Sequence, residues 1–469
     1  MPPSPASSRA TFVLTDESLC LATDLYQLTM AAAYYSRRPP PQGSFELFVR
    51  RLPLHRNFLV FAGLQQAMAS LSTLRFGDEE VDYLRSLAQF KQVESAFFEY
   101  LKDFAFSGDV YAMPEGTVFF PEEPVMRVTG TLLEAQLIET LLLSIVNFQT
   151  AICSKAARIR LAAGSDRSLA EFGSRRAHGP QAAAWVARAA YLAGFDSTSN
   201  LFAGKAMGIP VVGTMAHSFV MSFDSEREAF EEYVQLFPEN AILLVDTYDS
   251  LQGVRTAIDL GCPIAGIRLD SGNLGELARG ARDLLDRHGH STAKILVSGD
   301  LNETKIGLLL ADGAPIDSFG VGTQLATCSD APVVGGIYKL VEVLKGMESI
   351  PKFKDSTGKS TYPGRKQVIR RVSNGRMHGD RIVPADKSVH SGRSELMSDE
   401  QELLQQVIKD GEVLPQPSLI ESRLYTKRQL AELPVRLQQM DTEVTPYSVV
   451  IDPDLQALFD RGRIQRHRL

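Results

Sequence analysis

Cysteine is scarce in this chain, and its distribution excludes two kinds of site. The 469 residues include four cysteines, and no two of them form a C-x-x-C pair. They are Cys20, Cys153, Cys262 and Cys328. Zinc sites and disulfide frameworks usually depend on closely spaced cysteines, so neither is predicted here. Reduced thiols, as in a cytoplasmic protein, are expected instead.

Long apolar runs are also missing. The densest run, residues 141–146, is far shorter than the roughly 20 residues that a helix needs to cross a bilayer. The Pro- and Ser-rich start of the sequence has no apolar segment like that of a signal peptide. We therefore expect no membrane association and a cytoplasmic location.

Positive charge does not dominate the composition. Lys and Arg number 49 against 56 Asp and Glu, which gives a net charge of −7. This balance argues against a broad nucleic-acid surface, although it allows a local basic pocket for a phosphorylated small molecule. A hydrophobic content of 44% and a charged content of 22% are typical of a soluble enzyme.

The chain is long enough for two or three domains. An N-terminal α+β domain is expected over residues 1–129, with 1–12 disordered. An α/β barrel is expected over 130–345, and a C-terminal segment over 346–469 that packs back on the N-terminal domain. Helices are predicted at Leu132–Ser144, Ala151–Ala163 and Gly392–Val413. A basic hairpin is predicted within 350–395, and a loose tail from Arg461.

Five apolar, β-branched-rich runs lie between Gly208 and Leu325, and each stops at small or chemically active residues. The runs are Ile209–Gly213, Ala241–Val245, Ile264–Ile267, Ile295–Val297 and Phe319–Val321. Helix-like stretches fill the gaps between them, including Glu226–Phe237 and Leu274–Arg287. This alternation is typical of β-α units with parallel strands, and Leu169–Phe172 is a further strand candidate. Active sites of such folds collect where the strands end.

His217 and Asp246 follow the first two of these runs. A neutral imidazole at a strand end can be a nucleophile, a general base or a metal ligand. A carboxylate on the neighbouring strand can fix its tautomer and leave the other nitrogen free. The alternative is a histidine that is hydrogen-bonded only for structure.

The remaining three runs end in residues that suit a sugar phosphate. Arg268 and Asp270 are two apart, so both can face the same way. Arg268 suits a phosphate or pyrophosphate, and Asp270 suits a ribose hydroxyl or a magnesium-bound water. Ser298-Gly299 and Gly322-Thr323 allow backbone N–H groups to approach a phosphate. An internal ion pair and simple turns are the alternatives.

Phe172, Arg175 and Arg176 suit a planar, anionic ring, because an aromatic face can stack on it and a guanidinium can bind its charge. Two arginines after a glycine can also be a solvated turn. The basic run at 352–376 is interpreted as a solvated hairpin, with a nucleotide-phosphate role as the second interpretation.

These motifs together resemble the nicotinate phosphoribosyltransferases, a family of type II phosphoribosyltransferases. The matching stretches are Thr23–Met30, Phe45–Arg51, Glu171–Ala177, Gly194–Asn200, Gly213–Phe219, Asp246–Asp249, Ile267–Gly272, Gly320–Thr323, Gly336–Val341 and Thr361–Lys366. Each motif is modest, but they occur in the family's order. One departure is Asn273, where the family usually has Asp.

The resemblance implies a fold and a reaction. The fold is an irregular α/β barrel of the type II kind packed on an N-terminal α+β domain. The reaction converts nicotinate and phosphoribosyl pyrophosphate to nicotinate mononucleotide and pyrophosphate, driven by ATP hydrolysis, in NAD salvage. Magnesium is implied as cofactor, ATP as co-substrate, and a homodimer with shared active sites as the assembly.

The resemblance also implies roles for particular residues. His217 is the histidine phosphorylated by ATP, with Asp246 beside it. Phe172 stacks on the pyridine ring, Arg175 binds the carboxylate or a nearby phosphate, and Tyr26 of the partner subunit closes the other ring face. The ribose-phosphate and pyrophosphate ligands are Arg268, Asp270, Ser298, Gly299, Gly322 and Thr323.

Three other functions compete with this one. In nicotinamide phosphoribosyltransferase, the nearest rival, Asp196 would accept a hydrogen bond from the amide, whereas Arg175-Arg176 favours the acid. Quinolinate phosphoribosyltransferase is similar in fold, but this chain is too long for it. A non-catalytic sensor of pyridine nucleotides would bind ligand without turnover.

Overall fold

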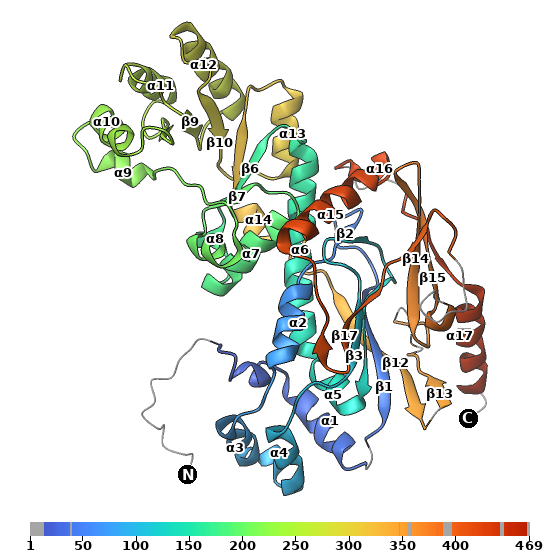
Figure 1. Ribbon diagram of the computed structural model, residues 1–469. Coiled ribbons are helices and arrows are strands. Elements are labelled where there is room, and N and C mark those ends of the chain that lie inside the picture. Colours follow the sequence, from blue (N-terminus) through green and yellow to red (C-terminus); the bar gives the residue numbers. More distant parts are fainter. Residues whose placement is uncertain are drawn as a thin grey trace.

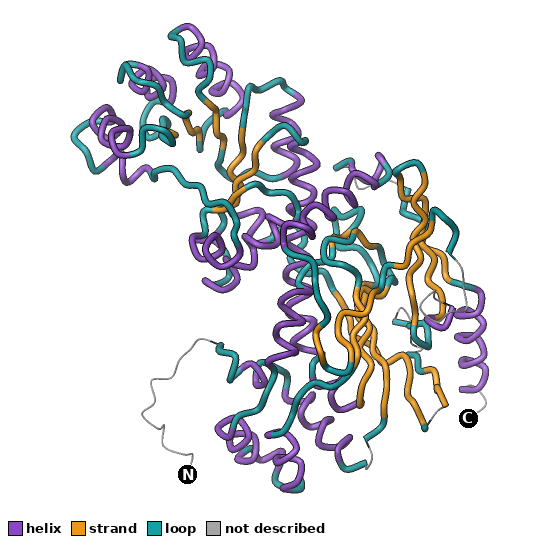
Figure 2. The backbone as a smooth tube through the Cα atoms, viewed as in Figure 1, coloured by secondary structure: helices purple, strands orange, loops and turns teal. Residues whose placement is uncertain are grey.

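The computed structural model describes residues 14–37, 40–346, 348–354, 356, 359–387, 396–440 and 445–466. The segment 1–12, expected to be disordered, lies outside these ranges. Figure 1 shows two groups of elements joined by the long helix α6, and Figure 2 shows that their strands form separate sheets.

An antiparallel sheet of seven strands dominates the first group in the described part of the chain. Its order is β13-β12-β1-β5-β3-β17-β18. The strands are β1 (Gln42–Val49), β3 (Asp109–Ala112), β5 (Pro124–Thr131), β12 (Gly336–Lys345), β13 (Glu348–Pro351), β17 (Gln405–Lys409) and β18 (Glu412–Val413). The sheet thus combines strands from the start, the middle and the end of the chain.

Strand β1 is covered on both faces, although its sequence alternates. Phe45 and Leu47 point into the apolar core, while Ser44 and Glu46 are also fully buried. Glu46 forms an ion pair with Lys366 at 2.8 Å, which compensates the buried charge. The second face is therefore closed by residues from the far end of the chain.

Helices surround this sheet. They are α1 (Leu25–Tyr35), α2 (Leu64–Thr73), α3 (Asp78–Ser86), α4 (Ser95–Lys102) and α5 (Leu132–Leu137), with short 3₁₀ turns at Leu19–Leu21 and Ala88–Phe90 and a small ladder of β2 (Leu59–Val60) with β4 (Val118–Phe119). Helix α5 packs on β1 and β5, and α1 packs on α5. A capping box begins α5: Glu134 N donates to Thr131 Oγ1 and Thr131 N donates to Glu134 Oε2.

Helix α6 (Glu139–Ala163) is one continuous helix of 25 residues, so the predicted break after Ser144 is wrong. The break comes earlier, at Ile138 between α5 and α6. Residues between the two predicted helices are held helical by tertiary contacts. For example, the Thr150 hydroxyl accepts a hydrogen bond from Ala62 N at 3.2 Å. Packing of this kind overrides weak local propensity.

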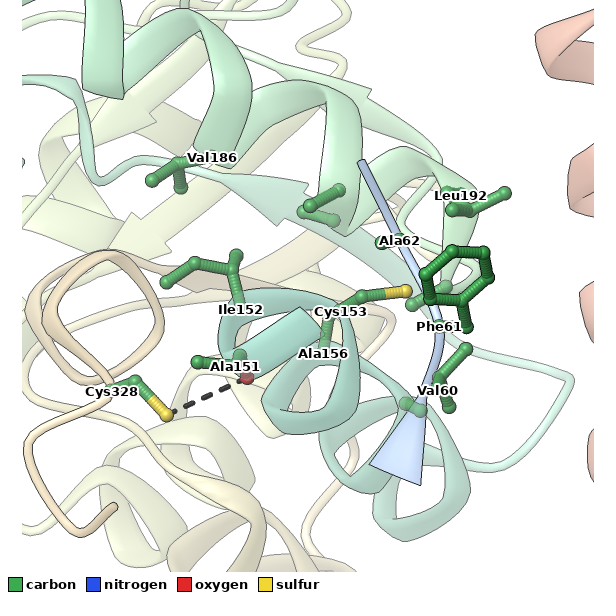
Figure 3. Packing of buried hydrophobic residues seen from close by; sticks show 14 of the residues in the cluster. Val60, Phe61, Ala62, Ala151, Ile152, Cys153, Ala156, Val186, Leu192 and Cys328 are labelled. Atoms are coloured by element: carbon green, nitrogen blue, oxygen red, sulfur yellow. Dashed lines mark hydrogen bonds between the residues drawn. The ribbon is translucent and has the colours of Figure 1, made fainter. Parts of the chain in front are cut away.

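Both groups of elements pack against α6. Figure 3 shows Ile152, Cys153 and Ala156 of α6 facing Phe61 on one side and Val186 on the other. Buried ions reinforce this packing: Lys155 pairs with Glu303 at 2.6 Å and with Asp330 at 3.1 Å. Arg158 pairs with the same glutamate at 3.0 Å.

The second group contains a parallel sheet of six strands in the described residues, with order β7-β6-β11-β10-β9-β8. The strands are β6 (Ser168–Glu171), β7 (Ser197–Thr198), β8 (Ile242–Leu244), β9 (Gly266–Leu269), β10 (Lys294–Val297) and β11 (Ser318–Val321). Every sequential pair is adjacent except β7 and β8, and β11 returns to β6. This cyclic order is that of a β/α barrel, which agrees with the expected fold class, although no pairing among the described residues joins β7 to β8.

Around this sheet lie α7 (Pro180–Leu192), α8 (Leu201–Met207), α9 (His217–Met221), α10 (Glu226–Leu236), α11 (Ser250–Ile258), α12 (Leu274–Arg287), α13 (Glu303–Ala311) and α14 (Thr323–Thr327), with a 3₁₀ turn at Ser174–Arg176. Four of the five predicted strands after Gly208 are present. Ile209–Gly213 is not a strand, because Val211 makes only an isolated bridge to Thr198. Pro210 has no N–H to donate to a ladder.

The C-terminal part differs most from expectation. The hairpin is present as β14 (Lys366–Ser373) and β15 (Arg376–Pro384), in a sheet with β16 (Glu400–Glu402) and β19 (Val449–Ile451). The helix predicted at Gly392–Val413 is wrong, since its described residues form β16, β17 and β18. Among the residues that the structure describes after the hairpin, a 3₁₀ turn at Ala385–Lys387 is followed by the helices α15 (Leu419–Glu432), α16 (Val435–Gln438) and α17 (Pro453–Arg466). The tail is therefore helical from Arg461 to Arg466, and the domain boundaries at 129 and 345 stay predictions.

No helix in the described ranges combines the length and apolar character needed to cross a membrane.

A buried charge cluster fixes the hairpin to the first sheet. Arg370 is fully buried and pairs with Asp380 at 2.5 Å, and the Tyr447 hydroxyl donates to the same carboxylate at 2.9 Å. Glu123 lies 4.0 Å from Arg370. Burial, and then the negative charge of Asp380, raise the pKa of Glu123 well above its usual range, while Arg370 partly opposes them.

We expect Glu123→Gln to gain stability relative to the wild type as pH rises. The wild-type carboxyl holds a proton when folded, so its contribution is retained at low pH and is lost as pH rises through the folded pKa. The difference grows by up to ~1.4 kcal/mol per pH unit in that window. Thermal unfolding midpoints from pH 5 to 8 test this, with Glu239→Gln at an exposed position as control. A constant difference between Glu123→Gln and wild type would contradict it.

Candidate active site

The carboxyl ends of the parallel strands bring most of the predicted residues together. Because these strands all run in one direction, the residues that follow them lie at one edge of the sheet. Phe172 follows β6, Asp246 follows β8, Asp270 follows β9, Ser298 follows β10 and Gly322 follows β11.

Arg268 is the centre of this edge. Its Nε donates to Ser298 Oγ at 2.8 Å and its Nη2 donates to Asp270 Oδ1 at 2.7 Å. Its Nη1 donates to Thr214 Oγ1 at 3.0 Å. Ser298 Oγ also donates to Asp270 Oδ1, so the three predicted residues form one closed network.

The charge of Asp270 is stabilised by these neighbours. Burial alone would raise the pKa of this carboxyl. The Ser298 hydroxyl, Arg268 and His217 outweigh burial and lower the pKa below its ordinary value. Asp270 is therefore an anion near pH 7, able to accept hydrogen bonds from sugar hydroxyls.

Phe172 lies over Gly320 and beside Arg268. The Arg268 guanidinium carbon is 5.7 Å from the centre of the Phe172 ring. A Cβ on Gly320 would lie 2.5 Å from two carbons of that ring, so only glycine leaves the ring in place. The result is an aromatic face next to a cation at the mouth of the sheet.

His217 is the first residue of α9 and its side chain is 40% exposed. Its Nδ1 lies 3.1 Å from Thr247 Oγ1, and its Nε2 lies 4.0 Å from Asp270 Oδ2. The Thr247 hydroxyl occupies one ring nitrogen, while the other faces the Arg268 network. An imidazole in this setting is open to a phosphorylated ligand.

Asp246 does not take the position expected for it beside His217. Its Oδ2 accepts hydrogen bonds from Asp270 N at 2.9 Å and from Ser271 Oγ at 2.6 Å. The residue that contacts the imidazole is the next one, Thr247. Asp246 thus orders the loop after β9, because its side chain turns toward the neighbouring strand.

Gly299 and Gly322 allow close approaches of the backbone. Gly299 has φ = +94°, and a Cβ there would overlap the carbonyl oxygen of Asp270. A Cβ on Gly322 would lie 3.0 Å from the carbonyl oxygen of Phe172. Thr323 begins α14 directly after it. The neighbouring backbone therefore fills the space beside both glycines. Binding of a phosphate at these positions stays a prediction.

The structure does not bring Arg175, Asp196 and Tyr26 into this network. Arg175 is exposed in the turn after Phe172 and lines a surface pocket with Asn200 and Phe202. Tyr26 lies on α1, which Figure 1 places far from β6 and α9 in the same chain. The residue is 50% exposed. A contact between Tyr26 and the site would require a second subunit.

Asp196 lies at the start of β7 rather than at its end. It pairs with Arg160 at 2.8 Å and with Arg423 of α15 at 3.0 Å, and it accepts a hydrogen bond from Leu169 N at 2.9 Å. These contacts use the carboxylate at the amino ends of the strands, opposite to Phe172. The expected amide contact of Asp196 is therefore not supported by its position.

Sequence reasoning missed Thr214 and Thr247, which hold Arg268 and His217. Both lie inside the motifs Gly213–Phe219 and Asp246–Asp249, so their position near the site was visible but their contacts were not. Asn273, the departure from the family pattern, caps α12 by accepting a hydrogen bond from Glu276 N at 3.5 Å.

This geometry defines a class of enzyme. An aromatic face, a central arginine, an ionised carboxylate and an accessible imidazole at the mouth of a parallel β/α sheet suit transfer of a phosphorylated sugar to a planar ring.

Comparison with known proteins gives the family. A model of the nicotinate phosphoribosyltransferase N-terminal domain matches residues 21–147, and one of the nicotinate phosphoribosyltransferase family matches residues 167–376. The chain is 41% identical to a nicotinate phosphoribosyltransferase of Mycobacterium tuberculosis over 92% of this chain and 91% of that one. It is 44% identical to that of Bacillus subtilis over 80% and 78% of the two chains.

Solved structures agree. The crystal structure of human nicotinic acid phosphoribosyltransferase matches with a TM-score of 0.81 at 31% identity, covering 94% of this chain and 99% of that one. The chain belongs to the nicotinate phosphoribosyltransferase family.

We expect Gly320→Ala to raise the KM for the ring substrate about tenfold or more while the protein stays folded. The new methyl group must displace the Phe172 ring from its position over the strand. Gly307→Ala is the matched control, because it lies in α13 with no atom within 4 Å of the added Cβ. Steady-state kinetics and thermal unfolding of both variants test this, and an unchanged KM for Gly320→Ala would exclude Phe172 as a ring contact.

Proposed function

We propose that this chain is a nicotinate phosphoribosyltransferase that couples ATP hydrolysis to synthesis of nicotinate mononucleotide. The observation that carries the proposal is the network of Arg268, Asp270 and Ser298 beside Phe172 and His217, in a chain of this family. The product feeds NAD salvage, and a cytoplasmic location fits that role.

The chemistry of the transfer needs little from the protein beyond position and charge. The pyridine nitrogen of nicotinate attacks the ribose carbon with its own lone pair, and the bond to pyrophosphate breaks. Positive charge develops on the ribose, so no general base is required. Asp270 binds ribose hydroxyls and lies near this charge, Arg268 binds the phosphate groups, and Phe172 keeps the ring in line. The 5′-phosphate is held by Ser298-Gly299 and Gly322-Thr323.

His217 links the reaction to ATP. Its Nε2 attacks the γ-phosphorus, the bond to the bridging oxygen breaks, and ADP leaves. Water later attacks the phosphorus, releases phosphate and returns the lone pair to Nε2. The Thr247 hydroxyl on Nδ1 supports this role, because it fixes the ring while the other nitrogen stays free. Negative charge on the imidazole tightens the site for the sugar pyrophosphate.

Magnesium enters with the substrate in this proposal. Across the described residues, no group of three or more His, Cys, Asp or Glu side chains is arranged to hold a metal ion. The residues present therefore do not form a magnesium cage of their own, and the pyrophosphate oxygens are the natural ligands. No step above requires a protein ligand to that ion.

A homodimer completes the site in this proposal. Tyr26 is exposed, and its helix α1 is far from β6, the strand that Phe172 follows (Figure 1), which leaves Tyr26 available to the partner subunit. Arg175 is exposed in the turn after Phe172, and in the dimer it would bind the nicotinate carboxylate.

We expect nicotinate, phosphoribosyl pyrophosphate, magnesium and ATP to give nicotinate mononucleotide, and nicotinamide to give at least about 100-fold less product because Arg175 finds no carboxylate. Chromatography of parallel reactions measures both. Equal or greater product from nicotinamide would assign the chain to the amide enzyme, and ligand binding without any product would favour the sensor.

We expect His217→Ala to abolish ATP hydrolysis and ATP stimulation, while slow ATP-independent transfer remains. Thr247→Val should lower the ATPase rate about tenfold through loss of the Nδ1 contact, with the KM for nicotinate unchanged. ATP-stimulated synthesis that persists in His217→Ala would contradict the proposal.

We expect Tyr26→Ala and Phe172→Ala to be weak alone and to recover about a quarter of wild-type activity when mixed, since half of the dimers then contain one intact site out of two. No recovery after subunit exchange would mean that the sites are not shared.

A further inference from the structure

Glu171 is a fully buried carboxyl group that the proposed reaction does not use. It is the last residue of β6, directly before Phe172, and it is 0% exposed. Its Oε2 accepts a hydrogen bond from the Thr198 hydroxyl at 2.6 Å, and its Oε1 accepts one from Gly173 N. A buried carboxyl is costly unless its oxygens are bonded, so these neutral donors hold it in one orientation.

Thr198 of β7 extends the hydrogen bonds to the neighbouring strand end. Its Oγ1 accepts from Asn200 N at 3.0 Å while its hydrogen is donated to Glu171. The main chain adds a third link, because Ser199 N donates to Glu171 O at 2.9 Å. The ends of β6 and β7 are therefore joined by side chains as well as by the parallel pairing of the strands.

Asn200 connects this bridge to the turn that follows Phe172. Its Oδ1 accepts from Ala203 N at 2.9 Å and so caps α8, while its Nδ2 donates to Ser174 Oγ at 3.1 Å. The side chains form one continuous chain of hydrogen bonds, here called the β6–β7 network: Glu171, Thr198, Asn200 and Ser174.

The β6–β7 network holds the turn that carries Arg175 at two points. Glu171 binds the N–H of Gly173, and Asn200 binds the hydroxyl of Ser174. Arg175 lines the same surface pocket of about 740 Å³ as Ser174 and Asn200. It is exposed, and no hydrogen bond or ion pair within the described ranges fixes its guanidinium. The direction of this side chain therefore depends on the main chain of the turn.

We propose that the members of the β6–β7 network are positioning residues, which orient Arg175 toward the carboxylate of a ring that lies on Phe172. None of them touches the substrate. Binding of a carboxylate by a guanidinium depends on direction, so a turn that is less firmly held binds the anionic ring more weakly. The sugar and ATP contacts lie at other strand ends and keep their geometry. This inference rests on the role proposed for Arg175.

The first test compares KM with kcat. Ser174→Ala removes one hydrogen bond without changing a charge, and it should raise the KM for nicotinate about fivefold. Glu171→Gln should raise it at least as much, because one of the two acceptor oxygens becomes an amide nitrogen that cannot accept. In Ser174→Ala, kcat and the ATPase rate measured without nicotinate should equal those of the wild type. Ser86→Ala is the control, since that exposed hydroxyl donates only within its own helix, to Tyr83 O at 2.7 Å.

A second test asks whether the effect passes through Arg175. Arg175→Ala should raise the KM for nicotinate, and adding Ser174→Ala to it should raise the KM no further, because no guanidinium is left to orient. A further fivefold rise in the double variant would show a general loosening of the site and would overturn the proposal. Unfolding midpoints of all variants are measured in parallel. If Glu171→Gln does not fold, Ser174→Ala at its partly exposed position still decides the question.

The outcomes separate this inference from the proposed function. A wild-type chain that makes no nicotinate mononucleotide would reject the proposed function and this inference with it. Normal synthesis with an unchanged KM in Ser174→Ala would reject the β6–β7 network alone. Normal synthesis with an unchanged KM in Arg175→Ala would reject Arg175 as the carboxylate contact, and the positioning of it as well, but not the reaction.

Discussion

The ion pairs of Lys155 and Arg158 with Glu303 are the constraint on which the two parts of this molecule depend. Lys155 and Arg158 belong to α6, against which both groups of elements pack, and Glu303 is the first residue of α13. Asp330 extends the same network to the segment after α14. Removing one partner would leave a charge buried without compensation, which costs about 3–5 kcal/mol. Apolar packing along α6 stabilises the contact between the two groups of elements, and the buried ion pairs restrict its geometry.

The active site uses charge compensation in a different way. Arg268 is bound by Asp270, Ser298 and Thr214, so the guanidinium is held in place by two strand ends and the loop that leads to His217. The orientation of this cation is therefore fixed without any ligand. The anionic Asp270 lies 2.7 Å from Arg268 and 4.0 Å from His217, so its charge couples these two side chains.

Sequence patterns predicted the helices and strand ends that depend on the spacing of residues along the chain. Leu274–Arg287 is helical at both predicted ends, because its apolar residues follow helical spacing and Asn273 caps it. Arg268, Asp270 and Ser298 were predicted to meet because adjacent parallel strands end at one edge. Side-chain directions and contacts between distant parts of the chain could not be predicted. Asp246 turns toward Ser271 instead of His217, and Asp196 precedes β7. Residues 405–409 form strand β17 because β3 offers them a partner.

The gap between β7 and β8 has a consequence for local stability. The segment from Ile209 to Ala216 joins the sheet through few main-chain hydrogen bonds, among them Thr198 N to Pro210 O at 3.0 Å and Val212 N to Thr198 O at 2.9 Å. Val211 and Val212 are 49% and 42% exposed, so little apolar surface holds this segment down. The free energy needed to open it is therefore small compared with that of β9 and β10, which are paired on both sides. Amide protons before His217 should exchange with solvent long before those of the neighbouring strands, so His217 can shift while the parallel sheet stays folded.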